Sequence, residues 1–370
     1  MSNIPFLCHF VDGISNNPNK DLSFDFKHIL ENKLHLSLDK NANSNKRVLI
    51  LSRKIDFEAD IVSIELLRRG IDYIRLNVED IPYSFSIAYN VNIESDVDCQ
   101  INLQSTITNI SNIATVWLRN FEYEIVNSSI NDLHTVFINQ QWNDALQILF
   151  DKIKGRWINS LESTYNANNR VNQFTIANKV GFKVPATLIT NDPDRATSFY
   201  YKYNKDIIIK ALHHHSIEFQ NKVFSYYTHK VTNEDLIKFE DLKYAPCILQ
   251  ERLTKRSELR VTVIRDEVFA VKIELRSNSL ELDDIHRYNI SQLPKVPIQL
   301  DHEMNTRCIN LVKLLGLDYG AIDFVIDKDN KLYFLEVNST GDWLWIERQT
   351  KLPITKAVVD LIANTIDNSK

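Results

Sequence analysis

The stretch LDYGAIDFVIDKDNKLYFLEVNSTGDWLWIE, residues 317–347, contains the pattern that decides the fold. Two runs of alternating residues rich in β-formers, Ala321–Asp327 and Leu332–Asn338, flank the turn-forming sequence Lys-Asp-Asn-Lys. Alternation on both sides of a polar turn is typical of a β-hairpin. We therefore expect a hairpin here and relate the rest of the chain to it.

Polar side chains in this hairpin predict a metal site. If the loop has an even number of residues, Asp323 lies directly opposite Glu336, and Asn338 lies on the same face two residues further on. Like charges that face each other among apolar neighbours repel unless a cation lies between them. Two carboxylates and an amide suit Mg²⁺ shared with substrate phosphates better than zinc. The alternative is an exposed hairpin whose acids are merely hydrated.

Length and composition describe an ordinary globular chain of two or three domains. It has 370 residues, of which 44% are hydrophobic and 25% charged, and a formal net charge of −5. There is no long Lys/Arg block, which argues against a dedicated nucleic-acid or anionic-membrane surface. The N-terminus lacks a signal-peptide pattern, and no apolar run approaches the ~18 residues of a membrane span. We expect neither nucleic acid nor membrane as a partner.

Cysteine and glycine usage narrows the class further. The four cysteines, Cys8, Cys99, Cys247 and Cys308, are far apart and have no C-x-x-C spacing, so neither a disulfide framework nor a zinc knuckle is indicated. A reducing compartment, the cytoplasm, fits best. Only seven glycines occur, and neither G-x-G-x-x-G nor G-x-x-x-x-G-K-[ST] is among the patterns they form. Rossmann and P-loop nucleotide sites are therefore excluded.

The periodicity of the chain predicts alternating helices and strands after an N-terminal extension. Arg47–Leu51, Phe57–Arg69 and Ile71–Leu76 predict a strand, a helix that ends at Gly70, and a second strand, which together form a βαβ unit. Further along, we expect helices at 137–150, 169–180, 301–315 and 355–366, a helix start at Asn191-Asp192-Pro193, and strands at 207–210, 248–253, 258–264 and 268–275. We divide the chain into an extension (1–46), a first domain (47–165), a central domain (166–245) and a C-terminal domain (246–370).

Charged residues on the predicted strands leave alternatives open. Lys210 closes a run of three isoleucines, so it is either a cation on an edge strand that prevents aggregation or a cation aimed at a ligand. Arg260, Glu274 and Arg276 either point together into a cleft or form cross-strand ion pairs on a hydrated face. The histidines at 213–215 are interpreted as a lid loop, because consecutive residues do not converge easily on one ion.

Taken in order, these residues resemble the ATP-grasp superfamily. The set is Lys210, the segment Gln250-Glu251-Arg252-Leu253, Glu258-x-Arg260, and Asp323 with Glu336 and Asn338. More narrowly, TLITNDP at 187–193 and FLEVN at 334–338 running into GDWLWIE are similar to the graspetide (microviridin-type) peptide macrocyclases. The resemblance covers approximately residues 47–365. It implies an α/β chain with an α+β ATP-grasp fold, in which an N-terminal βαβ pre-ATP-grasp domain precedes central and C-terminal ATP-grasp domains.

The resemblance also implies the cofactors, ATP and Mg²⁺, and a role for each residue of the set. ATP is expected between the central and C-terminal domains, with Lys210 on its α- and β-phosphates, Gln250, Glu251 and Leu253 at adenine, Glu258 at ribose, Arg260 at the γ-phosphate, and Asp323, Glu336 and Asn338 on Mg²⁺. Arg170 stands where the family usually has a lysine at the start of the central helix. Arginine keeps the charge but changes the geometry of that phosphate contact.

In such enzymes a side-chain carboxylate of a precursor peptide is activated as an acyl phosphate, and a hydroxyl or amine of the same peptide closes an ester or amide macrocycle. Lys210 and Arg260 are then catalytic, Arg276 and Arg287 are candidates for gripping acidic core residues, and Glu274 is a candidate near the acceptor. A homodimer is implied as well. Two other functions stay open, namely an ATP-grasp ligase for small amino acids or peptides, and an ATP-binding regulatory protein without turnover.

The N-terminal extension carries a second resemblance. Pro5-Phe6-Leu7-Cys8-His9-Phe10-Val11 is similar to the leader motif P-F-F-x-R-F-L of microviridin-type precursors, with His9 in place of the arginine. We hypothesise that residues 4–13 form a helix in the enzyme's own leader-binding groove and hold the enzyme in its competent state. The alternative is an ordinary apolar arm packed on the main body.

Overall fold

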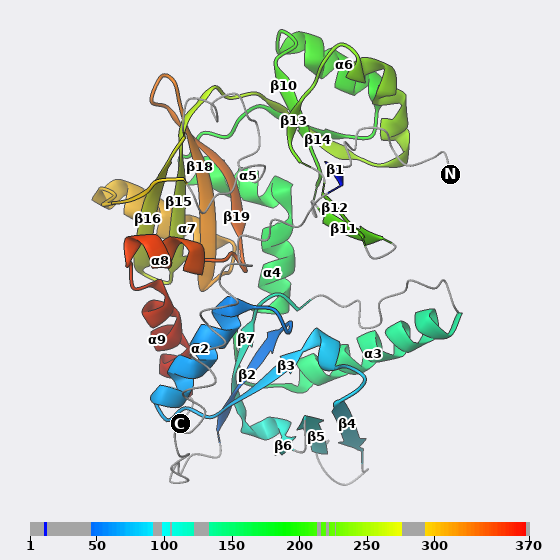
Figure 1. Ribbon diagram of the computed structural model, residues 1–370, viewed down its shortest axis with the longest axis vertical. Helices are drawn as coiled ribbons and strands as arrows, with labels where there is room; N and C mark the ends of the chain where they lie inside the picture. Colours follow the sequence, from blue (N-terminus) through cyan, green and yellow to red (C-terminus); the bar gives the residue numbers. More distant parts are fainter. Residues whose placement is uncertain are drawn as a thin grey trace.

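The computed structural model describes residues 11–12, 46–91, 98–103, 106–121, 133–212, 216–219, 222–225, 227–275 and 293–367. Their elements form three bodies: a parallel sheet with its helices at the bottom of Figure 1, a five-stranded sheet at the left, and a smaller sheet with helices at the upper right. Mixed helices and sheets in this arrangement agree with the predicted α/β fold class.

The predicted βαβ unit is confirmed. Strand β2 (Arg47–Ser52) pairs in parallel with β3 (Tyr73–Asn77) across helix α2 (Phe57–Arg68), in a sheet of order β3-β2-β7-β8 completed by β7 (Ile113–Leu118) and β8 (Arg156–Ile158). Asp56 caps α2, because its Oδ1 accepts a hydrogen bond from the Ala59 amide at 3.0 Å. Gly70 ends the helix with φ +70°, as the sequence predicted.

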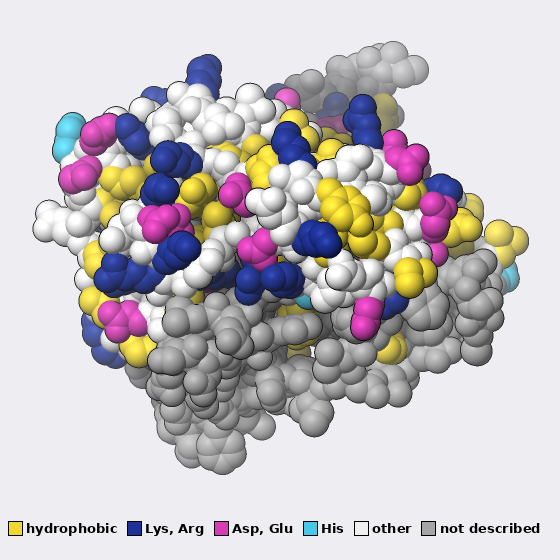
Figure 2. Space-filling view, turned by 90° about the horizontal axis from the view of Figure 1, so that it is seen from above, with side chains coloured by type: hydrophobic (Ala, Val, Ile, Leu, Met, Phe, Trp, Pro, Cys, Tyr) yellow, Lys and Arg dark blue, Asp and Glu magenta, His cyan; other side chains and the backbone are white. Residues whose placement is uncertain are grey.

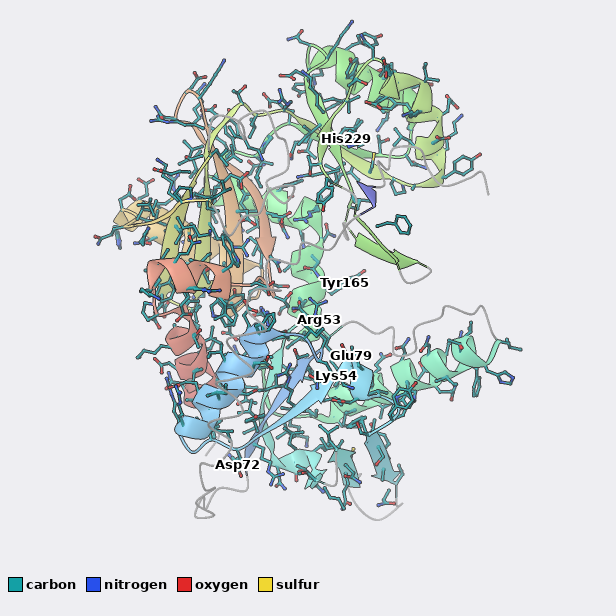
Figure 3. All side chains as sticks on the ribbon, in the orientation of Figure 1. Arg53, Lys54, Asp72, Glu79, Tyr165 and His229 are labelled. Atoms are coloured by element: carbon teal, nitrogen blue, oxygen red, sulfur yellow. The ribbon has the colours of Figure 1, made fainter. Side chains whose placement is uncertain are left out.

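The remaining elements of this body are η1 (Val78–Asp80), β4 (Phe85–Asn90), β5 (Asp98–Leu103), β6 (Thr106–Asn109), η2 (Ile110–Asn112), α3 (Leu133–Lys152) and α4 (Leu161–Asn168). Figure 3 shows the polarity of the parallel sheet: Asp72, just before β3, lies at its lower end, whereas Arg53, Lys54 and Glu79 lie at the end near Tyr165 of α4. The carboxyl ends of β2 and β3 therefore lie on the side of the other two bodies.

The upper body contains α6 (Pro193–Lys202), η3 (Asp235–Tyr244) and an antiparallel sheet of order β13-β10-β14-β9, whose strands are His229–Lys230, Ile207–Lys210, Cys247–Glu251 and Thr187–Thr190. Helix α5 (Arg170–Lys179) precedes these elements in the chain and packs against the five-stranded sheet. Beside it lies the hairpin of β11 (Ser216–Phe219) and β12 (Lys222–Ser225). Asp192 caps α6 with Pro193 at its first turn, as predicted.

The N-terminal extension is described at two residues. Val11 and Asp12 form strand β1 and pair antiparallel with Ser225 and Phe224 of β12. The helix predicted over residues 4–13 is therefore wrong at these two positions, where the backbone is extended; the other residues of that segment lie outside the described part of the chain.

The C-terminal body is an antiparallel sheet of order β17-β16-β15-β18-β19, formed by Lys295–Ile298, Glu267–Glu274, Lys255–Ile264, Tyr319–Asp327 and Leu332–Asn338. One face packs Leu259, Phe324 and Phe334 against α7 (His302–Leu314) and α5. The other face packs Ile264 and Val271 with α8 (Leu344–Thr350) and α9 (Ile354–Asp367). Because paired residues share a face, Arg260, which lies opposite Val271, belongs to this second face.

The predicted hairpin is present, but its register corrects the sequence argument. Near the turn, Phe324 pairs with Phe334 and Ile326 with Leu332, so the loop has an odd number of residues and not the even number assumed. A one-residue shift leaves Leu335 without its own partner, and beyond this bulge Asp323 lies opposite Glu336 as predicted. The bulge sends Phe334 to the α7 face and Glu336 to the opposite face.

The first and last bodies share a hydrophobic core. The cluster joins Val48, Val62 and Trp117 of the parallel sheet and α2 to Trp343 and to Val358 of α9. The rings of Trp117 and Trp343 lie 6.3 Å apart, centroid to centroid. The β19–α8 loop, which we define as residues 339–343, is therefore buried against residues that precede position 165.

The face of the molecule that Figure 2 shows from above carries Lys and Arg side chains interspersed with acidic and apolar ones. Among the described residues, no helix combines the length and apolar character that a membrane-spanning segment needs. Cys99, Cys247 and Cys308 are buried free thiols.

Glu58 of α2 is a buried carboxyl at the contact between the first and last bodies. Its side chain accepts hydrogen bonds from the amides of Trp343 and Leu344, both at 3.1 Å, and the residue is 4% exposed. Burial, reinforced by the nearby Asp342 carboxylate and opposed by Arg119, raises the pKa of Glu58 to about 7.

We expect Glu58→Gln to flatten the pH dependence of stability. The folded chain keeps the Glu58 proton up to pH of about 7, whereas the unfolded chain releases it near 4.5. The stabilisation is thus complete below pH ~4.5 and is lost as the pH rises to about 7, a loss of about 3 kcal/mol. Urea unfolding at pH 5 and pH 8 measures it. Parallel pH curves for the variant and the wild type would contradict this, and Glu65→Gln on the same helix is the control.

Candidate active site

Three charged residues lie in a row across β15, β18 and β19. Arg260 pairs with Asp323, and Asp323 pairs with Glu336, so all three side chains are on the same face of the sheet. Nη1 of Arg260 donates to Oδ2 of Asp323 at 2.6 Å, an ion pair in which the arginine is 10% and the aspartate 31% exposed. The predicted placement of Asp323 opposite Glu336 is therefore confirmed, and the ion pair with Arg260 adds a contact that the sequence did not predict.

The third member of the row, Glu336, has its own arginine. Nη1 of Arg170 lies 2.7 Å from Oε2 of Glu336. Arg170 is held there by α5, whose start is capped by Asn169 and whose Gln173 side chain bonds both the amide and the carbonyl of Val337. The arginine that stands where a lysine is usual therefore contacts a predicted metal ligand in this structure.

Ionising both Asp323 and Glu336 costs free energy, because the two carboxylates are close together and partly buried. Burial and the neighbouring Glu336 carboxylate raise the pKa of Asp323, and the Arg260 guanidinium opposes that shift. With both acids ionised, Arg170 and Arg260 neutralise them one to one. A carboxylate has about four lone-pair sites on its two oxygens, so pairing with an arginine does not prevent it from also binding a divalent cation.

Asn338 occupies the end of β19 on the same face, opposite Ala321. Its Oδ1 accepts the Thr340 amide at 2.9 Å, so the loop that follows the strand sets the amide's orientation. That loop packs tightly: a Cβ added at Gly341 would lie 2.7 Å from both Ala321 Cβ and Arg260 Nη2. Glycine is required at 341 because the backbone approaches the sheet so closely.

The sheet of the upper body, β13-β10-β14-β9, contains the second group of predicted residues. Nζ of Lys210 donates to Oε1 of Gln250 at 3.1 Å, and Nε2 of Gln250 donates to Thr187 at 2.8 Å. Strand β10 lies between β13 and β14, so the edge-strand interpretation of Lys210 is wrong. Glu251 ends β14, and Leu253 lies in the short link 252–254 that leads from this sheet into β15.

Not all predicted residues join the row. Glu258 lies two positions before Arg260, on the same face, and forms an ion pair with Lys255 at 2.8 Å. Glu274 is not brought to this group, because it pairs with Ser257 and so belongs to the opposite face of the sheet. Arg276, Arg287 and the histidines at 213–215 lie outside the described residues.

The residues present fit a Mg²⁺–nucleotide site. Two carboxylates and an amide on one face are oxygen donors of the kind that Mg²⁺ prefers when phosphates complete its coordination. Nε of Arg260 is buried and has no hydrogen-bond partner among the described residues, as expected of a donor kept for a ligand oxygen. Within the described ranges, no three His, Cys, Asp or Glu side chains are grouped closely enough to hold an ion by themselves.

Sequence reasoning missed two features of this site. The first is the bulge at Leu335, whose signal was available: Phe334 and Val337 are both large and apolar but three residues apart, which strict alternation does not allow on one buried face. The second is Arg119, a buried residue of the first body that contacts the β19–α8 loop. A single arginine after a buried strand carries no local signal of that contact.

Comparison with protein-family models identifies the fold. A model described as RimK-like ATP-grasp domain matches residues 167–362, and one described as MvdD pre-ATP grasp domain matches residues 47–165. The chain belongs to the RimK-like ATP-grasp family. It is therefore an ATP-grasp ligase, and the predicted resemblance to the ATP-grasp superfamily is confirmed.

Solved structures share the fold of this ATP-grasp ligase at low identity. A RiPP-associated ATP-grasp ligase of Chryseobacterium gregarium, in complex with ADP and a leader and core peptide, is 24% identical, with a TM-score of 0.74 over 86% of this chain and 97% of that chain. Macrocyclase MdnC of Microcystis aeruginosa, bound with precursor peptide MdnA, is 23% identical, with 0.75 over 86% and 99%. PsnB, with a phosphomimetic variant of minimal precursor, Mg and ADP, is 21% identical, with 0.68 over 87% and 100%. A search of curated proteins found no match.

We expect Glu336→Gln to weaken Mg²⁺-dependent nucleotide binding while leaving the fold intact. The amide keeps the shape of the carboxylate but removes a charged ligand, so the affinity for ADP in the presence of Mg²⁺ should fall about 10- to 100-fold. Affinity without Mg²⁺ should change little. Calorimetric titration of ADP with and without Mg²⁺ measures both values. Equal Mg²⁺ dependence in the variant and the wild type would refute the assignment of Glu336. Glu303→Gln is the control, because Glu303 is an exposed residue of α7, which packs on the opposite face of the sheet.

Proposed function

We propose that this ATP-grasp ligase forms ω-ester or ω-amide macrocycles in a ribosomally made precursor peptide. The observation that carries the proposal is the row of Arg260, Asp323 and Glu336 beside Asn338, in a chain whose fold matches peptide ligases and macrocyclases along nearly the whole of their length. MdnC was solved with a precursor peptide, and the Chryseobacterium ligase with a leader and a core peptide. A peptide substrate is the class these likenesses favour.

The reaction needs positioning and charge neutralisation but no protein nucleophile. A substrate carboxylate attacks the γ-phosphorus of ATP, the bond to the ADP oxygen breaks, and an acyl phosphate forms. A hydroxyl or amine of the same peptide then attacks the acyl carbon, phosphate leaves, and one proton is released. The peptide loses the elements of one water for each linkage. Catalysis of phosphoryl transfer in this way depends on electrostatic stabilisation.

The chain's own residues have the following proposed roles. Lys210 and Arg260 neutralise phosphate oxygens, with Arg260 presenting its unpartnered Nε. Gln250, Glu251 and Leu253 line the adenine, and Glu258 meets the ribose. Asp323, Glu336 and Asn338 would hold Mg²⁺, which would supply positive charge beside the phosphates. Arg276 and Arg287 as contacts of acidic core residues, and Glu274 near the acceptor, stay predictions.

Arg170 is proposed to have two alternative anionic partners, Glu336 without nucleotide and phosphate oxygens with nucleotide bound. Its ion pair with Glu336 neutralises the carboxylate in this structure, at 19% exposure of the arginine side chain. With nucleotide bound, the same guanidinium has phosphate oxygens as an alternative anionic partner. A lysine offers a single point charge instead of the planar fork, so Arg170 favours this exchange of partners.

The domain division and the extension are also proposals. We divide the chain at 47–165, 166–245 and 246–370, after an extension that supplies the leader in cis from residues 4–13. The pairing of Val11 and Asp12 with β12 supports contact between the extension and the central domain. The homodimer and the cytoplasmic location stay predictions; exposed apolar residues on α3, among them Leu133 and Phe137, support a second copy as partner, and light scattering of the purified chain checks it.

Incubation with ATP, Mg²⁺ and candidate core peptides tests the central proposal. We expect a mass decrease of one water per linkage, matched by equimolar ADP, and no product with Glu336→Gln. Mass spectrometry of the peptide and quantitation of ADP make the measurement. Ligation of free amino acids without loss of water within a peptide would favour the small-molecule ligase, and nucleotide binding without any ADP formation would favour the regulatory protein.

Truncation tests the leader in cis. We expect the full chain to process a core peptide that lacks its leader, and a chain without residues 2–40 to do so only when a peptide of residues 4–13 is added. Initial rates measured by mass spectrometry decide between a leader supplied in cis and an ordinary apolar arm. A scrambled peptide of the same composition is the control. Undiminished activity of the truncated chain without added peptide would contradict the leader in cis and would favour an ordinary apolar arm.

A further inference from the structure

The β19–α8 loop, residues 339–343, connects the metal side of the site to the first body of the molecule. It begins directly after Asn338, whose side chain accepts the Thr340 amide. Tyr319 donates its hydroxyl hydrogen to the Gly341 carbonyl at 2.5 Å, and Asn159 donates to the Ser339 carbonyl at 2.9 Å. The loop is therefore a fixed element of the site and is held along its whole length.

Arg119 makes the largest set of contacts with this loop. It follows strand β7 of the parallel sheet and is 3% exposed. Nη1 donates to the Thr340 carbonyl at 2.6 Å and lies 3.4 Å from the Gly341 carbonyl, while Nη2 donates to Oδ1 of Asp342 at 2.8 Å. One guanidinium thus contacts three successive residues through two separate nitrogens, a spacing that the single nitrogen of a lysine does not reproduce.

Arg119 is itself fixed by charge and by stacking. Asp56 approaches its Nε at 3.4 Å, and Glu58 lies 3.7 Å from Nη2. The guanidinium carbon is 5.8 Å from the Trp117 ring centroid and 5.2 Å from that of Trp343. The guanidinium is therefore held in one position by the buried acids and by the two aromatic rings.

Arg260 contacts the same loop from the site side. Its Nη2 donates to the Asp342 carbonyl at 3.4 Å, and the Trp345 indole donates to that carbonyl at 3.0 Å. The close approach of Gly341 to Arg260 Nη2 leaves no room for a Cβ. Any shift of residues 340–342 must therefore move Arg260, and with it the guanidinium that pairs with Asp323.

We propose that Arg119 is a positioning residue of the ligase site, through which the first body of the molecule sets Asn338 and Arg260 for Mg²⁺ and phosphate. The inference rests on the proposed roles of those two residues. A purely structural role at the contact between the bodies predicts a loss of stability alone. A positioning role predicts in addition a loss of Mg²⁺ affinity and of turnover that stability does not explain.

Arg119→Lys keeps the positive charge beside Asp56 and Glu58 but replaces the two nitrogens that bind the loop, Nη1 and Nη2, with one. We expect the folded variant to bind Mg²⁺ with ADP about 10- to 100-fold more weakly than the wild type, a typical cost of losing a group that orients metal ligands. At saturating Mg²⁺ the KM for ATP should rise and kcat should fall, while ADP binding without Mg²⁺ is unchanged. Calorimetry and ADP release measure these quantities.

A second variant and a control separate the outcomes. Asp342→Ala removes a half-exposed side chain and one Arg119 contact, and should shift Mg²⁺ affinity in the same direction by a smaller factor. Arg75→Met removes a partly buried arginine of the same sheet that pairs with Asp60, and should lower stability without changing Mg²⁺ affinity. Wild-type Mg²⁺ affinity in both Arg119→Lys and Asp342→Ala would overturn the proposal. If Glu336→Gln also bound normally, the metal assignment itself would have failed.

Discussion

The opposition of Asp323 and Glu336 across β18 and β19 is the constraint on which the site depends. Two carboxylates on one sheet face must be neutralised, and the structure does so with Arg260 from the neighbouring strand and Arg170 from the start of α5. Arg260 belongs to this sheet, and Arg170 belongs to α5, which packs against it. The charge balance thus ties the position of α5 to the register of the hairpin.

That register depends on one unpaired residue. Without the bulge at Leu335, Phe334 and Glu336 would share a face, and either the aromatic core or the carboxylate pair would be lost. With it, Phe334 packs against Phe324 and Phe174 while Glu336 faces the site. A local irregularity in the strand therefore allows one short segment to serve both the core and the chemistry.

The sequence predicted the helices, the strands and the candidate metal ligands better than it predicted the contacts between the three bodies. Periodicity and end signals located the βαβ unit, the cap at Asp192 and the glycine that ends α2, because these are local. The odd loop was missed because register depends on buried packing across the sheet. Arg119 was missed because its partners, Thr340 to Asp342, lie more than 200 residues away in the chain. The sequence placed Glu274 correctly on its strand. Which face of the sheet its side chain lies on depends on its pairing with Ser257, and the turn sequence alone did not determine that pairing.

The most direct test of this account is the position of the metal. A crystal of the chain grown with Mn²⁺ and a non-hydrolysable ATP analogue gives anomalous peaks that locate each ion independently of the model. The account predicts metal bound by Asp323, Glu336 and Asn338 oxygens and by phosphate, with Arg260 on the terminal phosphate. Metal bound elsewhere, with the Asp323–Arg260 and Glu336–Arg170 ion pairs unchanged, would contradict it.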